Sequence, residues 1–301
     1  MHHVTIVGGG FSGVLTAVQV MRECKQTVFI FLVNKDFPVA RGAAYSTESS
    51  SHLLNVRACN MSAFPDDQDH LVKWLSGQAG YAQYSPEKIS ELFIPRKVYG
   101  NYLDEVFNIE RVKFHLMGRG RLTLLNKEAT GLRKTTEGYA VSFSDETELF
   151  THQVILATGN TAPYLPVELE TIRQHARYIA EPWKRFPTTF LNDNTADVFI
   201  LGSGLSMVDA FISLEDAGWK GTVYTTSQHG LFPAKHHQLN TRRQLVEQDF
   251  LHCTLQEVVN IYRQLAEQAA AEGSDPLLVL DQLRPVTQYL WKHFSAKDKR
   301  R

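Results

Sequence analysis

The chain has 301 residues, of which 43% are hydrophobic and 21% charged, enough for about two folded domains and too apolar for a disordered protein. Its 31 basic and 32 acidic side chains give a formal net charge of -1, so no charge excess favours nucleic acid or an anionic membrane. The longest apolar run, Val28 to Val33, is about a third of a membrane span, and strand-like sequence begins near His3 without a preceding signal, so we expect a cytoplasmic protein.

The N-terminal pattern is a strand, a glycine turn, a helix and a second strand. Residues His3–Val7 predict a short buried strand, the helical pattern extends from Val14 to about Lys25, and Thr27–Val33 predict the next strand. This order is that of a βαβ unit. From Asn34 to about Pro65 the chain has no regular period, which favours a long functional loop.

The middle of the chain predicts helices followed by a small sheet. Helical patterns occupy about Asp69–Gln78 and Arg96–Phe107. Short alternating segments over Leu122–Phe150 predict an antiparallel β-meander, which continues into a strand at Gln153–Ala157.

A second strand, glycine turn and helix follow. Residues Asp197–Leu201 predict a strand, the helical pattern after the turn extends to Ala217, and Thr222–Thr226 predict another strand. The stretches Thr241–Ala270 and Leu277–Phe294 are helical by pattern. The sequence therefore predicts two βαβ units and a helical C-terminal segment.

The first turn has the spacing GxGxxG, with Gly8, Gly10 and Gly13 between strand and helix and with Phe11 and Ser12 inside it. The first glycine permits the tight turn, the second lets a pyrophosphate approach, and the third lets the helix pack on the strand. The helix start then offers backbone N–H groups to the phosphates. This context predicts dinucleotide binding, against the alternative that the glycines only make a tight turn.

The acid that normally binds the ribose hydroxyls after the second strand is absent from its usual place. Asn34 or Lys35 occupies that position, and Asp36 follows. An asparagine can still hydrogen-bond a hydroxyl. The adenosine contact is therefore supported less well than the pyrophosphate contact.

The second turn, GSGLSMVD, keeps Gly202 and Gly204 but has Met207 at the third glycine position. We interpret it as a second nucleotide site, with a degenerate Rossmann half that has lost its ligand as the alternative. Neither an arginine for a 2'-phosphate nor an acid for a ribose diol follows in Ser227 to Gly230, so the pattern does not separate NADH from NADPH.

Two glycine turns with an intervening ATGNTAP segment resemble the flavoproteins that bind FAD in one domain and NAD(P)H in a second, such as thioredoxin reductases and flavin monooxygenases. Within that group the chain resembles a bacterial subfamily of FAD/NAD(P)-binding proteins. The resemblance spans nearly the whole chain and depends most on the segments RGAAYSTESSSHLLNVRACNMSAFPDDQDHLVKWL, PRKVYGNYL and DQLRPVTQYLW.

The resemblance implies FAD at the first turn and a nicotinamide nucleotide at the second. It assigns FAD to Gly8, Gly10, Phe11, Ser12, Gly13, Asn34 and Lys35, with Arg41, Tyr45, Leu54, Asn55 and Met61 along the flavin half and Thr158 and Gly159 beneath it. It assigns the nicotinamide nucleotide to Gly202, Gly204 and Ser206.

Two departures from the family pattern concern the flavin site. Relatives of this subfamily are generally longer than this chain, which ends at Arg301, and the Gly-Asp pair that closes the ribityl site in the wider group is missing. We expect the flavin site to be open, impaired, or completed by a partner chain or by a second copy in a homodimer.

In this class the flavin performs the electron chemistry, so the protein needs no strong base or nucleophile. Cys24, Cys59 and Cys253 are too far apart for a disulfide framework, a metal set or the dithiol relay of thioredoxin reductases. His52 is the one weak catalytic candidate, since its unperturbed pKa lies near neutrality; the alternative is a histidine satisfied by backbone hydrogen bonds. No metal site is predicted.

The sequence thus predicts an α/β flavoprotein with three parts. These are a Rossmann-like FAD-binding domain with a β-meander insertion (1–165), a smaller Rossmann-like NAD(P)-binding domain (166–240) and a helical C-terminal segment (241–301). The predicted function is an FAD-dependent oxidoreductase that transfers hydride from NAD(P)H to FAD and on to a small organic acceptor or oxygen. The alternatives are a flavin-dependent monooxygenase or oxidase with a degenerate second site, and a non-catalytic FAD-binding subunit completed by a partner.

Overall fold

The computed structural model of the chain describes residues 2–35, 38–160, 165–182, 194–233, 250, 252–274, 276, 278–283 and 286–300. The chain divides into two compact units, Met1–Leu231 and Phe232–Arg301. The predicted domain boundaries after residues 165 and 240 stay predictions. Within the described ranges, no helix has both the length and the apolarity that crossing a membrane requires.

The first unit is built on a parallel sheet of four strands in the order β3-β2-β1-β7. The strands are β1 (His2–Val7), β2 (Val28–Asn34), β3 (Gly120–Asn126) and β7 (Gln153–Leu156). Helix α1 (Phe11–Glu23) joins β1 to β2, so the predicted βαβ unit is present, although the helix begins directly after Gly10 and not at Val14. Since β1 lies between β2 and β7, its carboxyl end is a topological switch point, where ligands bind in open α/β sheets.

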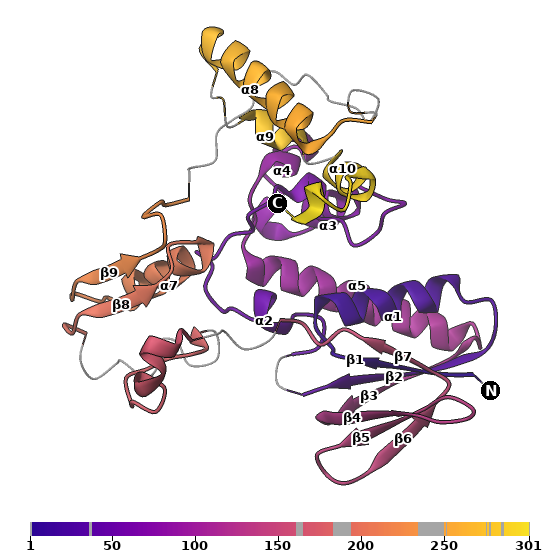
Figure 1. Cartoon of the computed structure of the whole chain (residues 1–301). Helices are drawn as coiled ribbons and strands as arrows, with labels where there is room; N and C mark the ends of the chain where they lie inside the picture. Colours follow the sequence, from indigo (N-terminus) through magenta and orange to yellow (C-terminus); the bar gives the residue numbers. More distant parts are fainter. Residues whose placement is uncertain are drawn as a thin grey trace. The chain divides into compact units, whose positions relative to one another are not determined.

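Two helices cover one face of this sheet, as Figure 1 shows for α1 and α5 (Arg96–Leu116). Both contribute to the main apolar core, α1 through residues such as Val14 and Met21 and α5 through residues such as Tyr102 and Phe107. Helix α5 was predicted to end at Phe107. It continues because a further buried side chain, Phe114, extends its apolar face.

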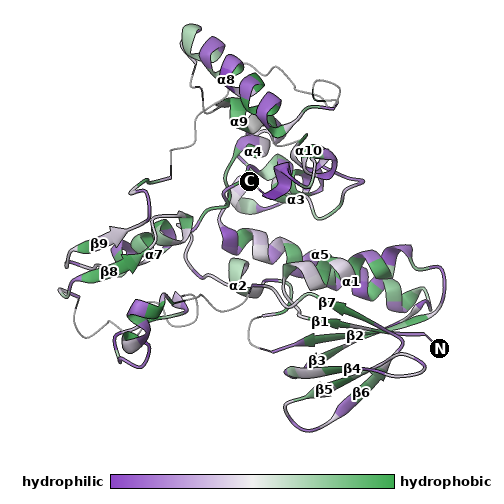
Figure 2. Cartoon of the chain, in the orientation of Figure 1, coloured by the Kyte–Doolittle hydropathy of each residue, from purple (hydrophilic) through white to green (hydrophobic). Residues whose placement is uncertain are grey.

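A three-stranded antiparallel meander lies on the other face: β4 (Ala129–Lys134), β5 (Tyr139–Phe143) and β6 (Glu148–Thr151). Its buried Val141 and Phe143 pack with Val33 in a second apolar cluster. In Figure 2 strands β1, β2 and β7 of the parallel sheet are predominantly hydrophobic, as strands covered on both faces require.

The predicted extent of the meander, Leu122–Phe150, is wrong at its start. Strand β3 pairs with β2 in the parallel sheet, with Gly120 opposite Val28 and Asn126 opposite Asn34. The local alternation around Leu122 is the same in either sheet, so only a partner far away in the sequence decides the pairing.

The long segment between β2 and α5 contains several short helices. They are α2 (Gly42–Tyr45), η1 (Ala58–Asn60), α3 (His70–Ser76), η2 (Ala79–Tyr81) and α4 (Pro86–Glu91). Helix α3 agrees with the predicted helix at Asp69–Gln78. Helix α4 was not predicted, although Ser85 accepts a hydrogen bond from Lys88 N–H and a proline follows at the first helical position, which are standard start signals.

The second βαβ unit follows the short helix η3 (Val167–Ile172) and has the predicted order. Strands β8 (Val198–Leu201) and β9 (Val223–Thr226) pair in parallel, with α7 (Leu205–Asp216) between them in the sequence.

The second unit, Phe232–Arg301, is helical where it is described, with α8 (Leu255–Ala271), α9 (Leu278–Leu283), α10 (Thr287–His293) and a short turn, η7 (Asp298–Arg300). Helix α8 begins with a capping box made by Thr254 and Glu257. The start of the predicted helix from Thr241 lies outside the described residues. A small apolar core contains Phe250, Val258, Val286 and Leu290.

Candidate functional site

The first glycine turn leaves no room for side chains at its two ends. Gly8 has φ +112°, and a Cβ atom on it would lie 2.1 Å from the carbonyl oxygen of Ala157. A Cβ atom on Gly13 would lie 1.8 Å from the carbonyl oxygen of Gly8. These contacts bring β1, β7 and α1 together at the switch point, so both glycines are required by backbone packing.

Gly10 has a different role. Its φ of -77° and ψ of -166° are open to any residue, and a Cβ atom there would meet only the Cα atom of Gly42, at 3.4 Å, and the Gly42 N atom, at 3.9 Å. Gly10 is also the N-cap of α1 and contributes no side chain to it, and the first turn of α1 carries no acidic residue. The first helical hydrogen bond runs from Val14 N–H to the Gly10 carbonyl at 2.9 Å, so the N–H groups of residues 11–13 precede the helical ladder.

Phe11, Ser12 and Gly13 therefore have backbone N–H groups outside the helical ladder, at the positive end of the helix dipole and next to a turn of glycines. This is the arrangement that binds a phosphate or pyrophosphate. The absence of a side chain at Gly10 and the N–H groups that precede the helical ladder of α1 fit the diphosphate bridge of FAD.

A segment after β2 packs against this turn. Ala40 N–H donates to the Gly9 carbonyl at 2.8 Å. Gly42 has φ +54°, and a Cβ atom on it would lie 3.1 Å from the Cα atom of Gly10. The ring of Tyr45 lies 5.7 Å from that of Phe11, centroid to centroid, and burial raises the pKa of its hydroxyl. Gly42 was not among the predicted site residues, although a glycine within RGAAY was a visible signal of a close approach.

Arg41 points to α5. Its Nε atom donates to Asp104 Oδ2 at 2.8 Å, and its Nη2 atom donates to Asn101 Oδ1 at 2.9 Å. Nη2 also lies 2.5 Å from Asp104 Oδ2. Because its charge is paired with a carboxylate, Arg41 is placed to hold the segment in position against the turn.

At the carboxyl end of β2 stands Asn34, close to the turn. A Cβ atom on Gly9 would lie within 2.7–2.8 Å of the Asn34 side chain. Lys35 forms an ion pair with Glu128, with an N–O distance of 2.5 Å. Asp36 lies outside the described residues. The structure therefore brings an amide, and not the usual carboxylate, beside the turn.

The remaining predicted flavin residues are spread around the first unit. Thr158 lies beside the turn, because its N atom would be 3.3 Å from a Cβ atom on Gly8. The next residue, Gly159, is exposed and has φ +72°. Leu54 is 4% exposed in the main core, Met61 packs on the same core, and Asn55 is exposed.

The backbone of the second turn repeats that of the first. Gly202 has φ +112°, and its N–H donates to the Thr226 carbonyl at 2.8 Å, as Gly8 N–H donates to that of Val33 at 2.9 Å. Gly204, the N-cap of α7, has φ -80° and ψ -173°, close to the values at Gly10. Ser206 is exposed in the first turn of α7.

The surroundings of the second turn differ from those of the first. A Cβ atom on Gly202 or Gly204 would meet no atom within 4 Å. Met207, at the third glycine position, is buried. The second turn therefore keeps an anion-binding backbone without the close packing of the first.

The predicted catalytic candidate, His52, is 5% exposed, and both of its ring nitrogens have partners. Nδ1 lies 2.7 Å from the hydroxyl oxygen of Thr47. Nε2 lies 3.0 Å from the carbonyl oxygen of Asp209 and 2.9 Å from the hydroxyl oxygen of Ser213, both on α7. These contacts join residues 157 positions apart in the sequence, which no local pattern could indicate.

An ion pair lies beside His52. Arg96 Nη1 is 2.8 Å from Asp209 Oδ2, and the side chain of Asp209 is 8% exposed. Burial raises the pKa of the Asp209 carboxyl, while the charge of Arg96 opposes that rise. Asp209 was part of the GSGLSMVD pattern, but neither it nor Arg96 was predicted to be a site residue.

A cleft of about 430 Å³ lies between residues 43–52 and α7 in the first unit. Its polar lining includes Ser46, Glu48, Ser49, His52 and Asp216. Ser49 Oγ donates to Asp216 Oδ2 at 3.1 Å. The cleft is large enough for a small polar molecule, next to the segment that crosses the first turn.

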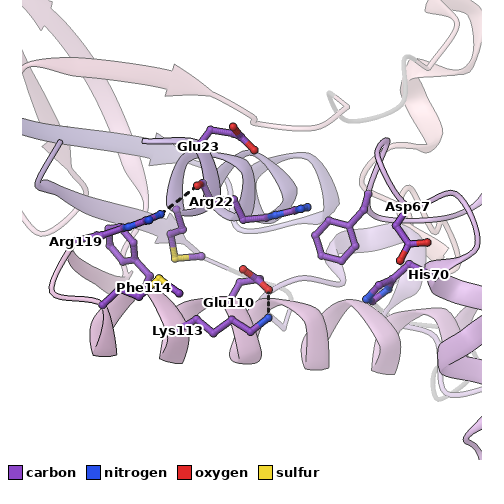
Figure 3. A pocket seen from close by; sticks show the side chains of 11 residues that line it. Arg22, Glu23, Asp67, His70, Glu110, Lys113, Phe114 and Arg119 are labelled. Carbon is purple, nitrogen blue, oxygen red and sulfur yellow. Dashed lines mark hydrogen bonds and ion pairs between the residues drawn. The ribbon is translucent and has the colours of Figure 1, made fainter. Parts of the chain in front are cut away.

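Figure 3 shows another cleft, of about 450 Å³, between α1 and α5. One of its lining residues, Arg22, lies in the last turn of the 13-residue helix α1. The cleft is therefore at the opposite end of the helix from the glycine turn, about 20 Å away. Its charges are largely paired, Lys113 with Glu110 at 2.7 Å and Arg22 with Asp66 at 2.8 Å. It is not part of the nucleotide site.

Comparison with known proteins identifies the family of the chain. A family profile described as FAD-NAD(P)-binding matches residues 5–161, just over half of the 301 residues. This match confirms the predicted family resemblance, the Rossmann-like α/β fold and the FAD and NAD(P) cofactor class. No curated protein matches the sequence significantly.

Solved structures are similar to this chain at low sequence identity, and one of them, with a TM-score above 0.5, shares its fold. The reduced form of the ornithine hydroxylase PvdA from Pseudomonas aeruginosa has a TM-score of 0.54 and 15% identity over 96% of this chain and 69% of that protein. The bacillithiol disulfide reductase YpdA from Staphylococcus aureus has a TM-score of 0.46 and 16% identity over 75% of this chain. The lysine monooxygenase NbtG from Nocardia farcinica has a TM-score of 0.46 and 14% identity over 74% of this chain. This chain spans 57% of YpdA and 56% of NbtG, little more than half of either.

Proposed function

Since the chain belongs to the FAD-NAD(P)-binding family of flavoprotein oxidoreductases, we propose that it is an FAD-dependent enzyme that uses NAD(P)H to reduce a small organic acceptor or oxygen. Bound FAD would supply the electron chemistry, taking a hydride equivalent from NAD(P)H and passing electrons to the acceptor. The protein contributes binding, orientation and exclusion of water.

The fit of the first glycine turn is the observation on which this proposal depends. Gly8 and Gly13 pack the backbone tightly, and Gly10 places no side chain beside the N–H groups at the start of α1. We assign the FAD diphosphate to the donors of Phe11, Ser12 and Gly13. Asn34 is placed to hydrogen-bond the ribose in place of the usual carboxylate.

The nicotinamide nucleotide is assigned to the second turn. The backbone at Gly202 and Gly204 has nearly the same dihedral angles as the first turn, so the start of α7 offers the same kind of anion site. We assign the acceptor to the cleft between residues 43–52 and α7, whose hydroxyl and carboxylate groups favour a small polar molecule.

One observation favours a second candidate, a flavin-dependent oxidase or monooxygenase without a nicotinamide site. Met207 is buried where the first turn has Gly13, and a Cβ atom on Gly202 or Gly204 would have no neighbour within 4 Å. A turn that keeps its shape after losing its ligand would have these features.

Anaerobic titration separates the two candidates. The purified chain is expected to be yellow and to release FAD on heating, and its flavin absorption band is expected to bleach when NADPH or NADH is added. A yellow protein that neither nucleotide bleaches supports the second candidate. A colourless protein that takes up no FAD contradicts both.

A further inference from the structure

A set of polar side chains, two of them buried and three half-buried, joins the segment beside the first turn to helix α7. It consists of Thr47, His52, Arg96, Asp209 and Ser213, which we call the α7 bridge. His52 and Asp209 are 5% and 6% exposed. Buried polar groups at a junction are stable only when each finds its partner, so the bridge fixes one relative placement of the two segments.

One partner of His52 fixes a proton on its Nε2 atom. The carbonyl oxygen of Asp209 can only accept, so Nε2 carries the proton and donates at 3.0 Å. Ser213 Oγ donates to the same carbonyl at 2.9 Å. Nδ1 shares a hydrogen bond with the Thr47 hydroxyl at 2.7 Å. Both nitrogens are committed, so the ring acts as a positioning group and is not free to serve as a base.

Arg96 holds both sides of the junction. Its backbone N–H donates to the His52 carbonyl at 2.8 Å, and its Nε atom donates to the Leu53 carbonyl at 3.1 Å. Its Nη1 atom lies 2.8 Å from Asp209 Oδ2 on α7. A single side chain therefore connects the loop that contains His52 to α7.

Each side of the bridge leads to a glycine turn. On one side, the segment that ends at His52 begins with Ala40 and Gly42, which contact Gly9 and Gly10. On the other side, α7 begins at its N-cap Gly204. A continuous set of packed and hydrogen-bonded groups thus extends from the first turn to the second.

We infer that the α7 bridge couples the two nucleotide sites, with His52 and Arg96 as positioning residues. FAD at the first turn restrains the segment 40–52, and the bridge passes that restraint to α7, so the nicotinamide nucleotide binds more tightly to the FAD-loaded chain than to the FAD-free chain. The expected difference is about tenfold, within the usual range of coupling between sites. The inference rests on the proposed function, because it takes the second turn as the nicotinamide site.

Calorimetric titration measures this coupling without turnover. NADPH and NADH are titrated separately into the FAD-free and the FAD-loaded full chain, for the wild type, His52→Ala and Arg96→Met. The ratio of the nucleotide's dissociation constant for the FAD-free chain to that for the FAD-loaded chain is expected to be about ten in the wild type and near one in both variants. FAD affinity measured with and without the nicotinamide nucleotide must change by the same factor, because coupling is reciprocal.

Two further variants guard against simple misfolding. Lys97→Met removes the neighbouring, exposed ion pair of Lys97 with Glu48 and is expected to keep the wild-type ratio. The double variant Arg96→Met with Asp209→Leu removes both charges of the buried pair, which proteins often tolerate, and is expected to fold yet give a ratio near one.

The outcomes distinguish the inference from the function beneath it. If the wild type binds neither nicotinamide nucleotide, the assignment of the second turn is wrong and the coupling falls with it. If the wild type binds one of them but the ratio is the same in the wild type, the single variants and the double variant, only the coupling through the bridge is overturned.

Discussion

Replacing Gly10 by alanine separates folding from FAD binding. The φ and ψ of Gly10 suit alanine, and the closest atom to the new Cβ atom would be the Cα atom of Gly42 at 3.4 Å, an ordinary contact. Loss of glycine's flexibility in the unfolded chain stabilises by about 0.4–1 kcal/mol, and alanine's poorer N-capping offsets much of this gain. We expect the free energy of unfolding to change by less than about 1 kcal/mol.

On the proposed assignment, the same methyl group would stand in the path by which the diphosphate reaches the N–H groups at the start of α1. Hydrogen bonds to a charged group contribute roughly 1.5–3 kcal/mol each. Losing two of them costs about 3–6 kcal/mol, which weakens FAD binding by roughly 10²- to 10⁴-fold.

The assay is equilibrium dialysis against FAD, with urea unfolding of the FAD-free protein beside it. Gly80→Ala is the control, because Gly80 is exposed and its Cβ position has no neighbour within 4 Å. It should bind FAD like the wild type. If Gly10→Ala folds and binds FAD within a few-fold of the wild type, the diphosphate does not lie at this turn.

Gly13→Ala should destabilise the fold itself, by about 1–3 kcal/mol or more, because its Cβ atom would lie 1.8 Å from a backbone carbonyl oxygen; urea unfolding without FAD shows whether that cost is real. Gly204→Ala, with no neighbour within 4 Å, should leave FAD affinity and stability unchanged and weaken NAD(P)H binding by calorimetry; an unchanged NAD(P)H affinity would argue against the second site. Asn34→Glu should restore the usual ribose contact and tighten FAD binding by up to about tenfold, and no gain in dialysis would place the ribose elsewhere. The hydrogen bond from Lys127 lowers the pKa of the Asp145 carboxyl from 3.8 to about 2. Because the folded-state pKa lies below the unfolded value, the ionised Asp145 carboxylate stabilises the fold above pH 3.8, and this stabilisation is lost as the pH falls towards 2. The difference in free energy of unfolding between the wild type and Asp145→Asn should therefore shrink over that range in unfolding curves. A constant difference would contradict the assignment.

The parts of the fold that depend on neighbouring residues were predictable. A glycine turn between a strand and a helix is local, so the order around Gly8 and around Gly202 follows from the sequence. The start of α4 was predictable in the same way, because its Ser-Pro pair is a local signal, although the helix was not predicted. The end of α5 was misjudged because the residues between Phe107 and the next buried side chain, Phe114, are polar except for the exposed Ile109 and Val112.

What could not be predicted depends on contacts between distant segments. Strand β3 has a local pattern that fits either sheet, and its pairing with β2 decides between them. The pairing of Arg41 with Asp104, 63 residues later, is such a contact, and the place of Arg41 along the flavin stays a prediction. The same holds for His52, whose partners on α7 follow from how the two βαβ units pack in three dimensions.

The central claim is that the bare turn at residues 8–13 holds the diphosphate of FAD. Calorimetric titration of the FAD-free wild type with FAD tests it most directly. We predict a single site with one FAD per chain, for which added ADP competes, because both ligands present a diphosphate. Absence of binding heat, or FAD binding that ADP does not affect, would contradict it.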